Sequence, residues 1–347
     1  MTDERISFVP TPAPDLNGGA MEAARQRWTT RAKPPGALGV IEQLAVHLAG
    51  VTGCCPPPVP RFSQIAVFAG DHGVVADGAS AWPSEVTAAM VRTISGGGAA
   101  INAFARTIGA SVTVIDVGVA AALPEMPGVI DRRLRPGTAS IARSPAMTVA
   151  EATASVTIGS DTANRLVDDG ADCLIGGEMG IGNTTPAAAL ISAITGRSPD
   201  SVTGTGAGVP ELGLEHKCAL VTTAVARTEG WSDPLILLAE VGGLEIGALA
   251  GFYIAAARRR VPFVLGCVIA GAALCLADLL APGTARRAIA GHRSAEPAAT
   301  FALEHLGLCP LLDLDLRLGE GTGATLAVPL LVAAARALAD MADLPTT

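Results

Sequence analysis

The segment from Leu311 to Met341 places one carboxylate on a glycine loop between a predicted strand and a predicted helix. Apolar and charged residues alternate over 311–318, which is typical of a strand, and Gly-Glu-Gly-Thr-Gly at 319–323 ends the alternation. The residues after this loop favour helix. Such loops bind anions and small ligands in α/β folds. Because a Glu would repel an anion, we interpret Glu320 as a general base; the alternative is a surface carboxylate at a helix N-terminus.

The same order of strand, polar loop and helix recurs along the chain. Strands predicted at 63–69 and 172–175 run into the loops 70–73 and 176–185, which are rich in Gly, Asp, Glu, His, Thr and Asn. Alternating strands and helices predict a mostly parallel sheet with helices on both faces. Ligands bind beyond the carboxyl ends of such strands, so we expect the loops to converge on one site, although each alone could be a tight turn.

The chain before this unit has a different character. Helices are predicted at 18–31 and 38–49, and the proline-rich stretch 54–58 marks a boundary. Farther on, Thr185 is predicted as an N-cap with Pro186 at the first helical position.

Charge and cysteine content narrow the function classes. A net charge of −8 with no basic cluster beyond Arg132-Arg133 argues against nucleic acid, and favours small-molecule partners. Seven cysteines without CxxC spacing, and no His pair with metal-site spacing, indicate a reducing cytoplasm and no metal. The longest uncharged run, 261–277, predicts a buried strand and helix and no membrane span. The acidic, proline-rich N-terminus does not resemble a signal peptide.

Several side chains are candidates for the site, each with a structural alternative. Glu178 lies among glycines and would stabilise positive charge at a reacting centre, or would only order the loop. Lys217, one of two lysines, is the best candidate for a phosphate, and its alternative is a solvated helix lysine. Asp71-His72 is read as a structural loop with His72 near the ligand. His292-Arg293 would bind phosphate or form a surface loop.

Two phosphate-binding motifs are absent. Neither lysine is followed by Ser or Thr, which excludes a Walker P-loop. Asp168-Asp169 is followed by Gly170-Ala171 rather than by the Thr-Gly loop that binds pyrophosphate in type I phosphoribosyltransferases. A phosphoribosyl donor for this chain would therefore not be the pyrophosphate sugar.

Motifs in order along nearly the whole chain resemble the nicotinate-nucleotide:dimethylbenzimidazole phosphoribosyltransferases. They are KPPGALG at 33–39, FAGDHGVVADGASAWPSEVT at 68–87, GGAAIN at 97–102, GEMGIGNTTPAA at 177–188, VGGLEIGALAG at 241–251, GHRSAEP at 291–297 and LDLRLGEGTGA at 314–324. The resemblance implies transfer of 5-phosphoribose from nicotinate mononucleotide to 5,6-dimethylbenzimidazole in cobalamin synthesis, without a cofactor.

The resemblance also implies an architecture and a set of site residues. It implies a Rossmann-like α/β domain at 60–330, a small helical domain from 1–59 with 331–347, and a homodimer. Glu320 and Glu178 would be catalytic. The residues implied in substrate binding are Ser80 and Leu318 at the base, and Gly180, Gly182, Asn183, Thr184, Lys217 and His72 around the nucleotide.

Three positions depart from the family pattern. The family commonly has Gln where Ala89 stands, Asp-Gly at 266–267, where this chain has Gly-Cys, and Asp-Asp at 210–211, where it has Pro-Glu. Loss of a polar residue at Ala89 would leave room for a different base. These departures keep two alternatives open: a transferase for another azole or phenol, and a catalytically silent nucleotide-binding homologue acting as a regulator or heterodimer partner.

Overall fold

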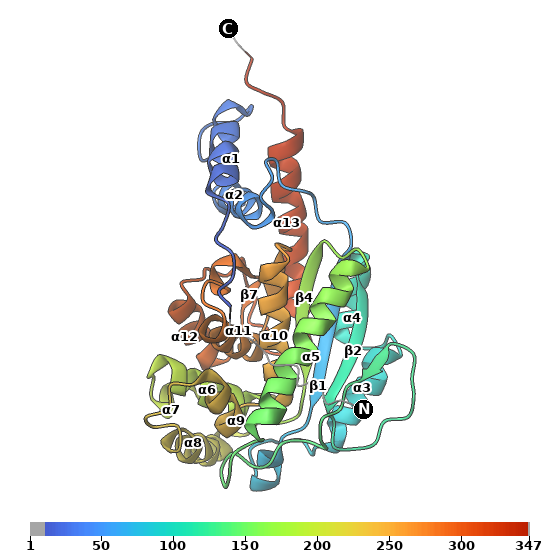
Figure 1. Ribbon diagram of the computed structural model, residues 1–347, viewed down its shortest axis with the longest axis vertical. Coiled ribbons are helices and arrows are strands. Elements are labelled where there is room, and N and C mark those ends of the chain that lie inside the picture. The colour runs from blue at the N-terminus through green and yellow to red at the C-terminus, as the bar shows by residue number, and fades with distance from the viewer. Residues whose placement is uncertain (1–10, 346–347) are drawn as a thin grey trace.

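A six-stranded sheet in which all paired strands are parallel forms the centre of the molecule (Figure 1). The computed structural model describes residues 11–345. The strands, in the spatial order β3-β2-β1-β4-β5-β6, are β1 (Ser63–Gly70), β2 (Ser111–Gly118), β3 (Val129–Asp131), β4 (Cys173–Met179), β5 (Phe263–Leu265) and β6 (Ala288–Ala290). This is the strand order of the Rossmann fold: strands are added in one direction from β1 to β3 and in the opposite direction from β4 to β6. The predicted fold class is confirmed.

Helices cover both faces of the sheet, because alternate strand residues point to opposite sides. In β1, Ala66 and Phe68 pack on one face, while Ile65, Val67 and Ala69 pack on the other. The helices are α1 (Gly18–Thr30), α2 (Val40–Thr52), η1 (Gly73–Asp77), α3 (Glu85–Ser95), α4 (Ala100–Thr107), α5 (Val149–Asp168), α6 (Thr184–Thr195), α7 (Pro199–Val202), α8 (Glu211–Ala226), α9 (Pro234–Val241), α10 (Leu244–Arg258), α11 (Val268–Leu280), η2 (Ala285–Arg287), α12 (Pro297–Leu306) and α13 (Thr322–Asp340).

The scarcity of aromatic side chains is matched by very close helix packing. Helices α5 and α10 touch through glycine: a Cβ on Gly159 would lie 1.7 Å from the carbonyl oxygen of Ala248, and one on Gly251 would lie 1.8 Å from that of Val156. Any larger residue at either position would push the helices apart. The Ala- and Gly-rich composition thus allows a dense core without large rings.

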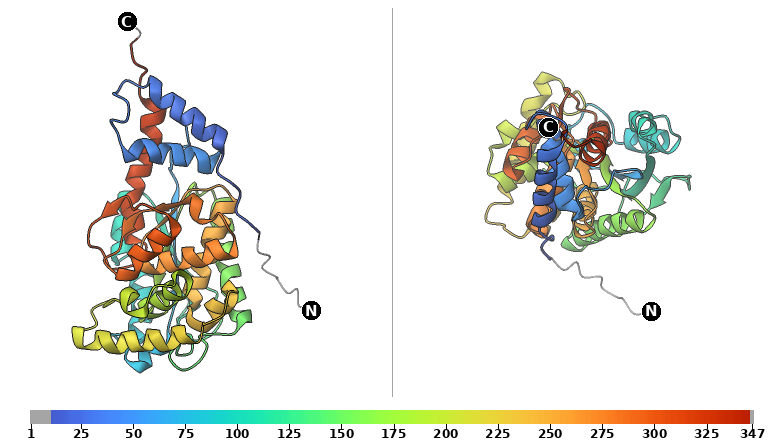
Figure 2. Two further views of the ribbon diagram at one scale, coloured as in Figure 1. Left: turned by 90° about the vertical axis from the view of Figure 1, so that its left-hand side faces the viewer. Right: turned by 90° about the horizontal axis from the view of Figure 1, so that it is seen from above.

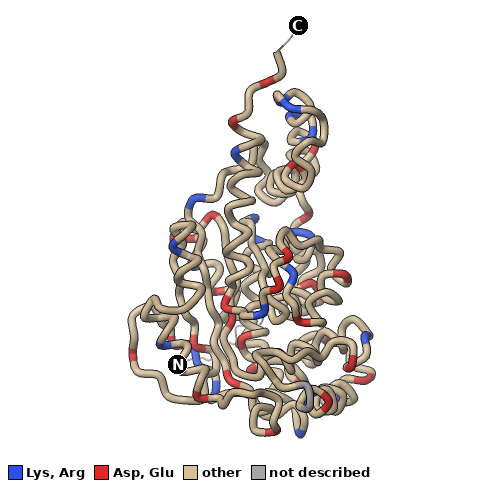
Figure 3. Tube along the Cα trace, turned by 180° about the vertical axis from the view of Figure 1, so that it is seen from behind, with Lys and Arg blue, Asp and Glu red and all other residues tan. Residues whose placement is uncertain are grey.

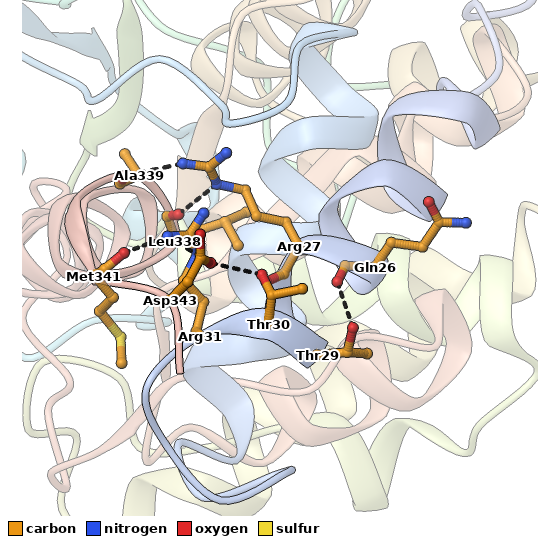
Figure 4. A network of polar contacts seen from close by, with 9 residues as sticks. All are labelled: Gln26, Arg27, Thr29, Thr30, Arg31, Leu338, Ala339, Met341 and Asp343. Carbon is orange, nitrogen blue, oxygen red and sulfur yellow. Dashed lines mark hydrogen bonds and ion pairs between the residues drawn. The ribbon is translucent and has the colours of Figure 1, made fainter. Parts of the chain in front are cut away.

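Helices α1 and α2 lie against the far end of α13, so segments from opposite ends of the chain pack together (Figures 1 and 2). Arg27 donates from Nε to the carbonyl of Leu338 at 2.9 Å and from Nη2 to that of Ala339 at 3.1 Å (Figure 4). Arg31 donates to the carbonyl of Met341. These arginines satisfy carbonyls at a helix C-terminus, where positive charge is favoured.

A buried arginine fixes the segment before α1. Arg287 is 0% exposed, and its guanidinium donates to the carbonyls of Pro14 and Asp15, both at 2.6 Å, and of Val51 at 3.1 Å. It therefore joins this segment, the end of α2 and the edge of the sheet.

Some predicted elements differ from the structure. The strand predicted at 311–318 is reduced to β8 (Leu312–Asp313), which pairs with β7 (His292–Arg293), because Asp315 has a φ of 54° that breaks an extended run. Helix α6 begins at Thr184 with Asn183 as N-cap, so the prediction of Thr185 as N-cap is wrong. Pro186 is tolerated there because first-turn N–H groups lack helical partners.

One helix in the described part of the chain, α13, is long and apolar enough to pass a length and composition test for a membrane span, with 56% of the tested window buried. It packs against α2, α4, β4 and β5, which is the environment of a core helix. The run at 261–277 forms β5 and α11, as predicted. Figure 3 shows basic and acidic residues interspersed along the chain.

Candidate active site

Three polar loops meet at the carboxyl ends of β1 and β4, where the strand order reverses. A Cβ on Gly180 would lie 2.3 Å from the carbonyl oxygen of Gly70, so the first two loops touch through glycine. A Cβ on Gly319 would lie 2.3 Å from Oε1 of Glu178, which brings in the third loop. The expected convergence of the loops is therefore present in the structure.

Glu320 has a backbone conformation that L-residues rarely adopt. Its φ is 61°, and Gly319 and Gly321 on either side have φ values of 92° and 87°. A left-handed residue other than glycine costs about 1–2 kcal/mol, so the surrounding contacts hold this peptide in place. The side chain is 3% exposed, and Oε2 accepts a hydrogen bond from the amide of Ile101 at 3.3 Å. Burial raises the pKa of Glu320.

Glu178 is held at both carboxylate oxygens at the end of β4. The Asn183 amide donates to Oε2, and Sγ of Cys267 lies 3.2 Å from Oε1. Burial raises the pKa of Glu178 to about 7; Glu245 and Glu320 also favour the protonated form, and the contacts to Cys267 and Asn183 oppose it. Glu178 therefore changes charge near neutral pH, which is common for residues at functional sites.

His72 lies next to these loops but outside the cavity that they line. Its side chain is 1% exposed, and Nε2 is 2.9 Å from Oε1 of Glu245, whose side chain is fully buried in the first turn of α10. Burial disfavours the imidazolium, but the carboxylates of Glu245, Asp71 and Glu178 outweigh it and raise the pKa of His72. His72 lies beside the loops but does not line the cavity between them, so its contact with a ligand stays a prediction. The sequence analysis had not singled out Glu245, although it lies in VGGLEIG.

A cavity of about 90 Å³ lies between these loops. The predicted site residues that line it are Ser80, Glu178, Gly180, Gly182, Asn183, Thr184, Lys217 and Leu318. Glu320 and His72 do not line it. Cys267, Glu296 and Arg317 also line it, and the sequence analysis had assigned them no role in the site.

Lys217 is buried, which contradicts the alternative of a solvated helix lysine. It is 1% exposed, and Nζ donates to Oγ1 of Thr184 and to the carbonyl of Gly204, both at 2.8 Å. Burial lowers the pKa of Lys217 to about 8, and the nearby carboxylate of Glu296 partly offsets this. Glu296 in turn accepts from the amide of Gly206 at 2.9 Å and so fixes the loop at 204–208 beside the lysine.

Two other predictions from the sequence fall outside the cavity. Ala89 is exposed on α3 and does not line it, and the expectation of a roomier base pocket there stays a prediction. Thr87 and Ala88 of this turn are buried, and Oγ1 of Thr87 accepts from the amide of Ile181 at 3.0 Å. Arg293 lies 3.5 Å from Asp313 in the β7–β8 pair, also outside the cavity. Within residues 11–345, no group of three or more His, Cys, Asp or Glu residues has the arrangement of a metal site.

Comparison with known proteins gives one consistent result. Residues 13–346 match a family model described as Phosphoribosyltransferase. Nicotinate-nucleotide--dimethylbenzimidazole phosphoribosyltransferases from Salinispora tropica and Thermus thermophilus are 48% and 49% identical, covering 94% and 91% of this chain and 94% of each relative. A crystal structure of the Thermus thermophilus enzyme has a TM-score of 0.90 at 47% identity, covering 94% of this chain and 97% of that one. A structure of CobT from the same organism has a TM-score of 0.91 at 48% identity, with the same coverage.

Proposed function

Because this chain belongs to the nicotinate-nucleotide:dimethylbenzimidazole phosphoribosyltransferase family, we propose that its site transfers the 5-phosphoribosyl group of nicotinate mononucleotide to 5,6-dimethylbenzimidazole. The products are α-ribazole 5′-phosphate and nicotinate, in the assembly of the cobalamin nucleotide loop. The observation that supports this most directly is the buried Glu320, held in a strained conformation at the meeting point of the loops.

The leaving group needs no acid. Nicotinate is bound to C1′ through a pyridinium nitrogen, and bond cleavage returns the electron pair to that nitrogen and leaves a neutral ring. A glycosidase that expels an alkoxide needs a carboxylic acid to protonate it, in addition to a second carboxylate. One base is therefore enough for this transfer.

The incoming base supplies the proton that must be removed. One ring nitrogen of dimethylbenzimidazole attacks C1′, and the ring becomes cationic unless the other nitrogen loses its proton. Glu320 accepts that proton, and burial, which raises its pKa, makes it a stronger base than an exposed carboxylate. General-base catalysis contributes about 10²- to 10⁴-fold to the rate. Attack on the face opposite the departing nicotinate inverts the β configuration to α.

We assign Glu178 to the positive charge that develops on the ribosyl ring and Lys217 to the negative charge of the phosphate. Ionised Glu178 stabilises the positive charge that develops on the ribosyl ring, because its oxygens are already oriented by Asn183 and Cys267. Lys217 is a buried cation on the same cavity and is the group that we assign to the phosphate. The amides of Gly180 and Gly182 lie beside them with no side chain to block approach.

The cavity of about 90 Å³ is smaller than the roughly 300–1,000 Å³ of ligand pockets. Its wall must therefore open for a nucleotide. The indole Nε1 of Trp82 donates to the carbonyl of Ala207 at 2.9 Å and joins the loop of Ser80 to the loop beside Lys217. We expect nucleotide binding to separate these two loops.

Three features remain proposals about the whole molecule. We assign 60–330 to the Rossmann-like domain and 1–59 with 331–347 to the small helical domain, supported by the packing of α1 and α2 on the end of α13. A homodimer is supported by the family resemblance. A cytoplasmic location is supported by the seven cysteines, none of which is paired.

The test is to incubate the purified protein with nicotinate mononucleotide and a mixture of dimethylbenzimidazole, benzimidazole, adenine and phenol, and to identify products by mass spectrometry. Formation of α-ribazole 5′-phosphate is the expected result, and the product ratio ranks the bases. A folded protein that binds the nucleotide but releases no nicotinate with any base would overturn the proposal and favour a silent homologue.

A further inference from the structure

The thiol of Cys267 lies directly against Glu178. Cys267 is the N-cap of α11, where its Sγ accepts from the amide of Ala270 at 3.5 Å. The same sulfur donates its S–H to Oε1 of Glu178 at 3.2 Å. Both residues line the cavity, with Cys267 7% exposed and Glu178 4% exposed. The helix start therefore fixes the sulfur, and the sulfur contacts the carboxylate.

The groups around Glu178 favour its protonated form more than its ionised form. Two further carboxylates lie near it, Glu245 from α10 and Glu320 from the third glycine loop, and so does the phenol of Tyr253 from α10. His72 is the nearby basic side chain, and it is engaged with Glu245. The groups that donate hydrogen bonds to Glu178 are the Asn183 amide at one oxygen and the Cys267 thiol at the other.

Glu178 has little freedom to turn away from this donor. Gly319 packs so closely on Oε1 that a Cβ there would lie 2.3 Å from it. Burial also raises the pKa of the Cys267 thiol well above its usual value, so the sulfur keeps its proton. A protonated thiol is a weak donor and a poor nucleophile, which excludes a covalent role.

We propose that Cys267 is a positioning residue for phosphoribosyl transfer: its S–H donates to Oε1 of Glu178 and holds that side chain as a carboxylate facing the ribosyl ring. This inference rests on the proposed function. In this role Cys267 stabilises the negative charge of Glu178 and does not contact the substrate.

The test is the pH dependence of kcat/KM in Cys267→Ala and Cys267→Ser. Alanine removes the donor, so the acid limb of the profile is expected to move to higher pH by about 0.5–1 unit, as for loss of one hydrogen bond. At pH 6.5 kcat/KM falls roughly 3- to 10-fold, and at pH 8.5 it changes less than about 2-fold. Serine restores a donor and the original limb. Cys275→Ala, a buried cysteine of the same helix outside the cavity, is the matched control.

A second readout does not depend on turnover. The carboxyl ¹³C resonance of Glu178, assigned by its absence in Glu178→Gln, is titrated in wild type and in Cys267→Ala, and the midpoint is expected to rise in the alanine variant. An unchanged midpoint, or equal shifts for serine and alanine in the pH profile, overturns the inference. If wild type releases no nicotinate but the midpoint still shifts, the proposed function fails while the contact between thiol and carboxylate stands.

Discussion

The two ends of the molecule both bury charge, but they treat it differently. At the end formed by α1, α2 and the far end of α13, the guanidinium of Arg287 donates to three backbone carbonyls, and Arg27 caps a helix with two bonds. At the carboxyl ends of β1 and β4, burial raises the pKa of Glu178, and the nearby carboxylates of Glu245 and Glu320 raise it further. At the terminal helices, the arginine side chains connect segments that are distant in sequence. At the strand ends, the carboxylates line or adjoin the site that we propose binds the nucleotide.

Buried polar atoms without a hydrogen-bond partner, within residues 11–345, lie at both ends. Near the site they include Oδ1 of Asp71, Nδ1 of His72 and the hydroxyl of Tyr253, and near the terminal helices they include Nε of Arg31 and Nε2 of His47. Each such group costs stability. The two ends therefore differ in what their charged groups contact, which is backbone carbonyls at the terminal helices and other ionisable side chains at the strand ends.

The largest expected effect comes from replacing Glu320, and it distinguishes the cost of its left-handed backbone from its role as the general base. Glu320→Gly removes the general base and also relieves the left-handed backbone, so kcat is expected to fall by about 10²- to 10⁴-fold while the free energy of unfolding rises by about 1 kcal/mol. Asp315→Gly is the matched control, because Asp315 is also left-handed, with a φ of 54°, but is exposed. It should gain stability and keep activity. Steady-state kinetics and denaturant unfolding measure both quantities, and equal losses of activity in the two variants would contradict the role of Glu320.

The next largest effect is a loss of stability when the contacts of Arg287 near the terminal helices are removed. Arg287→Met leaves the carbonyls of Pro14, Asp15 and Val51 without their donor, so the free energy of unfolding is expected to fall by about 3 kcal/mol or more. Turnover per folded molecule, measured well below the unfolding midpoint, should change little because Arg287 lies outside the cavity. A loss of turnover with unchanged stability would contradict the structural role that we assign to Arg287.

The smallest expected effect is the contribution of Glu178, at the strand ends, to the pH dependence of stability. The folded-state pKa of Glu178 is about 7, above its unfolded value, so ionised Glu178 destabilises the fold. The penalty is absent below the unfolded pKa, grows as pH rises toward 7, and is complete above it. Glu178→Gln should therefore raise the melting temperature at pH 8 more than at pH 5. Melting curves at both values decide the matter, and an equal rise would show that Glu178 carries no such penalty.

The parts of the site that were predictable from sequence are those encoded by neighbouring residues. Glycines around Glu320 and Glu178 mark loops at which the backbone can approach a ligand closely. Parallel pairing of the strands follows from the alternation of strands and helices. These features are local or follow from general rules of chain connection.

The parts that were not predictable depend on contacts between distant segments. Glu245 and Glu296 come from helix termini far along the chain, and nothing in their own neighbourhoods indicates that they face His72 and Lys217. The face of α3 that packs inward is set by tertiary contacts, so the residues next to Ala89 do not indicate that it is exposed. A strand was predicted at 311–318 because alternation is the same in a strand and in an extended loop.

Helix α13 begins two residues after Glu320 and runs without interruption to Asp340 beneath α1 and α2. Nineteen residues form a rod of about 28 Å. Pro329 lies inside this helix and removes one of its backbone hydrogen bonds. The contacts of Arg27 and Arg31 with the carbonyls of Leu338, Ala339 and Met341 therefore anchor the same helix whose first turn lies beside Glu320.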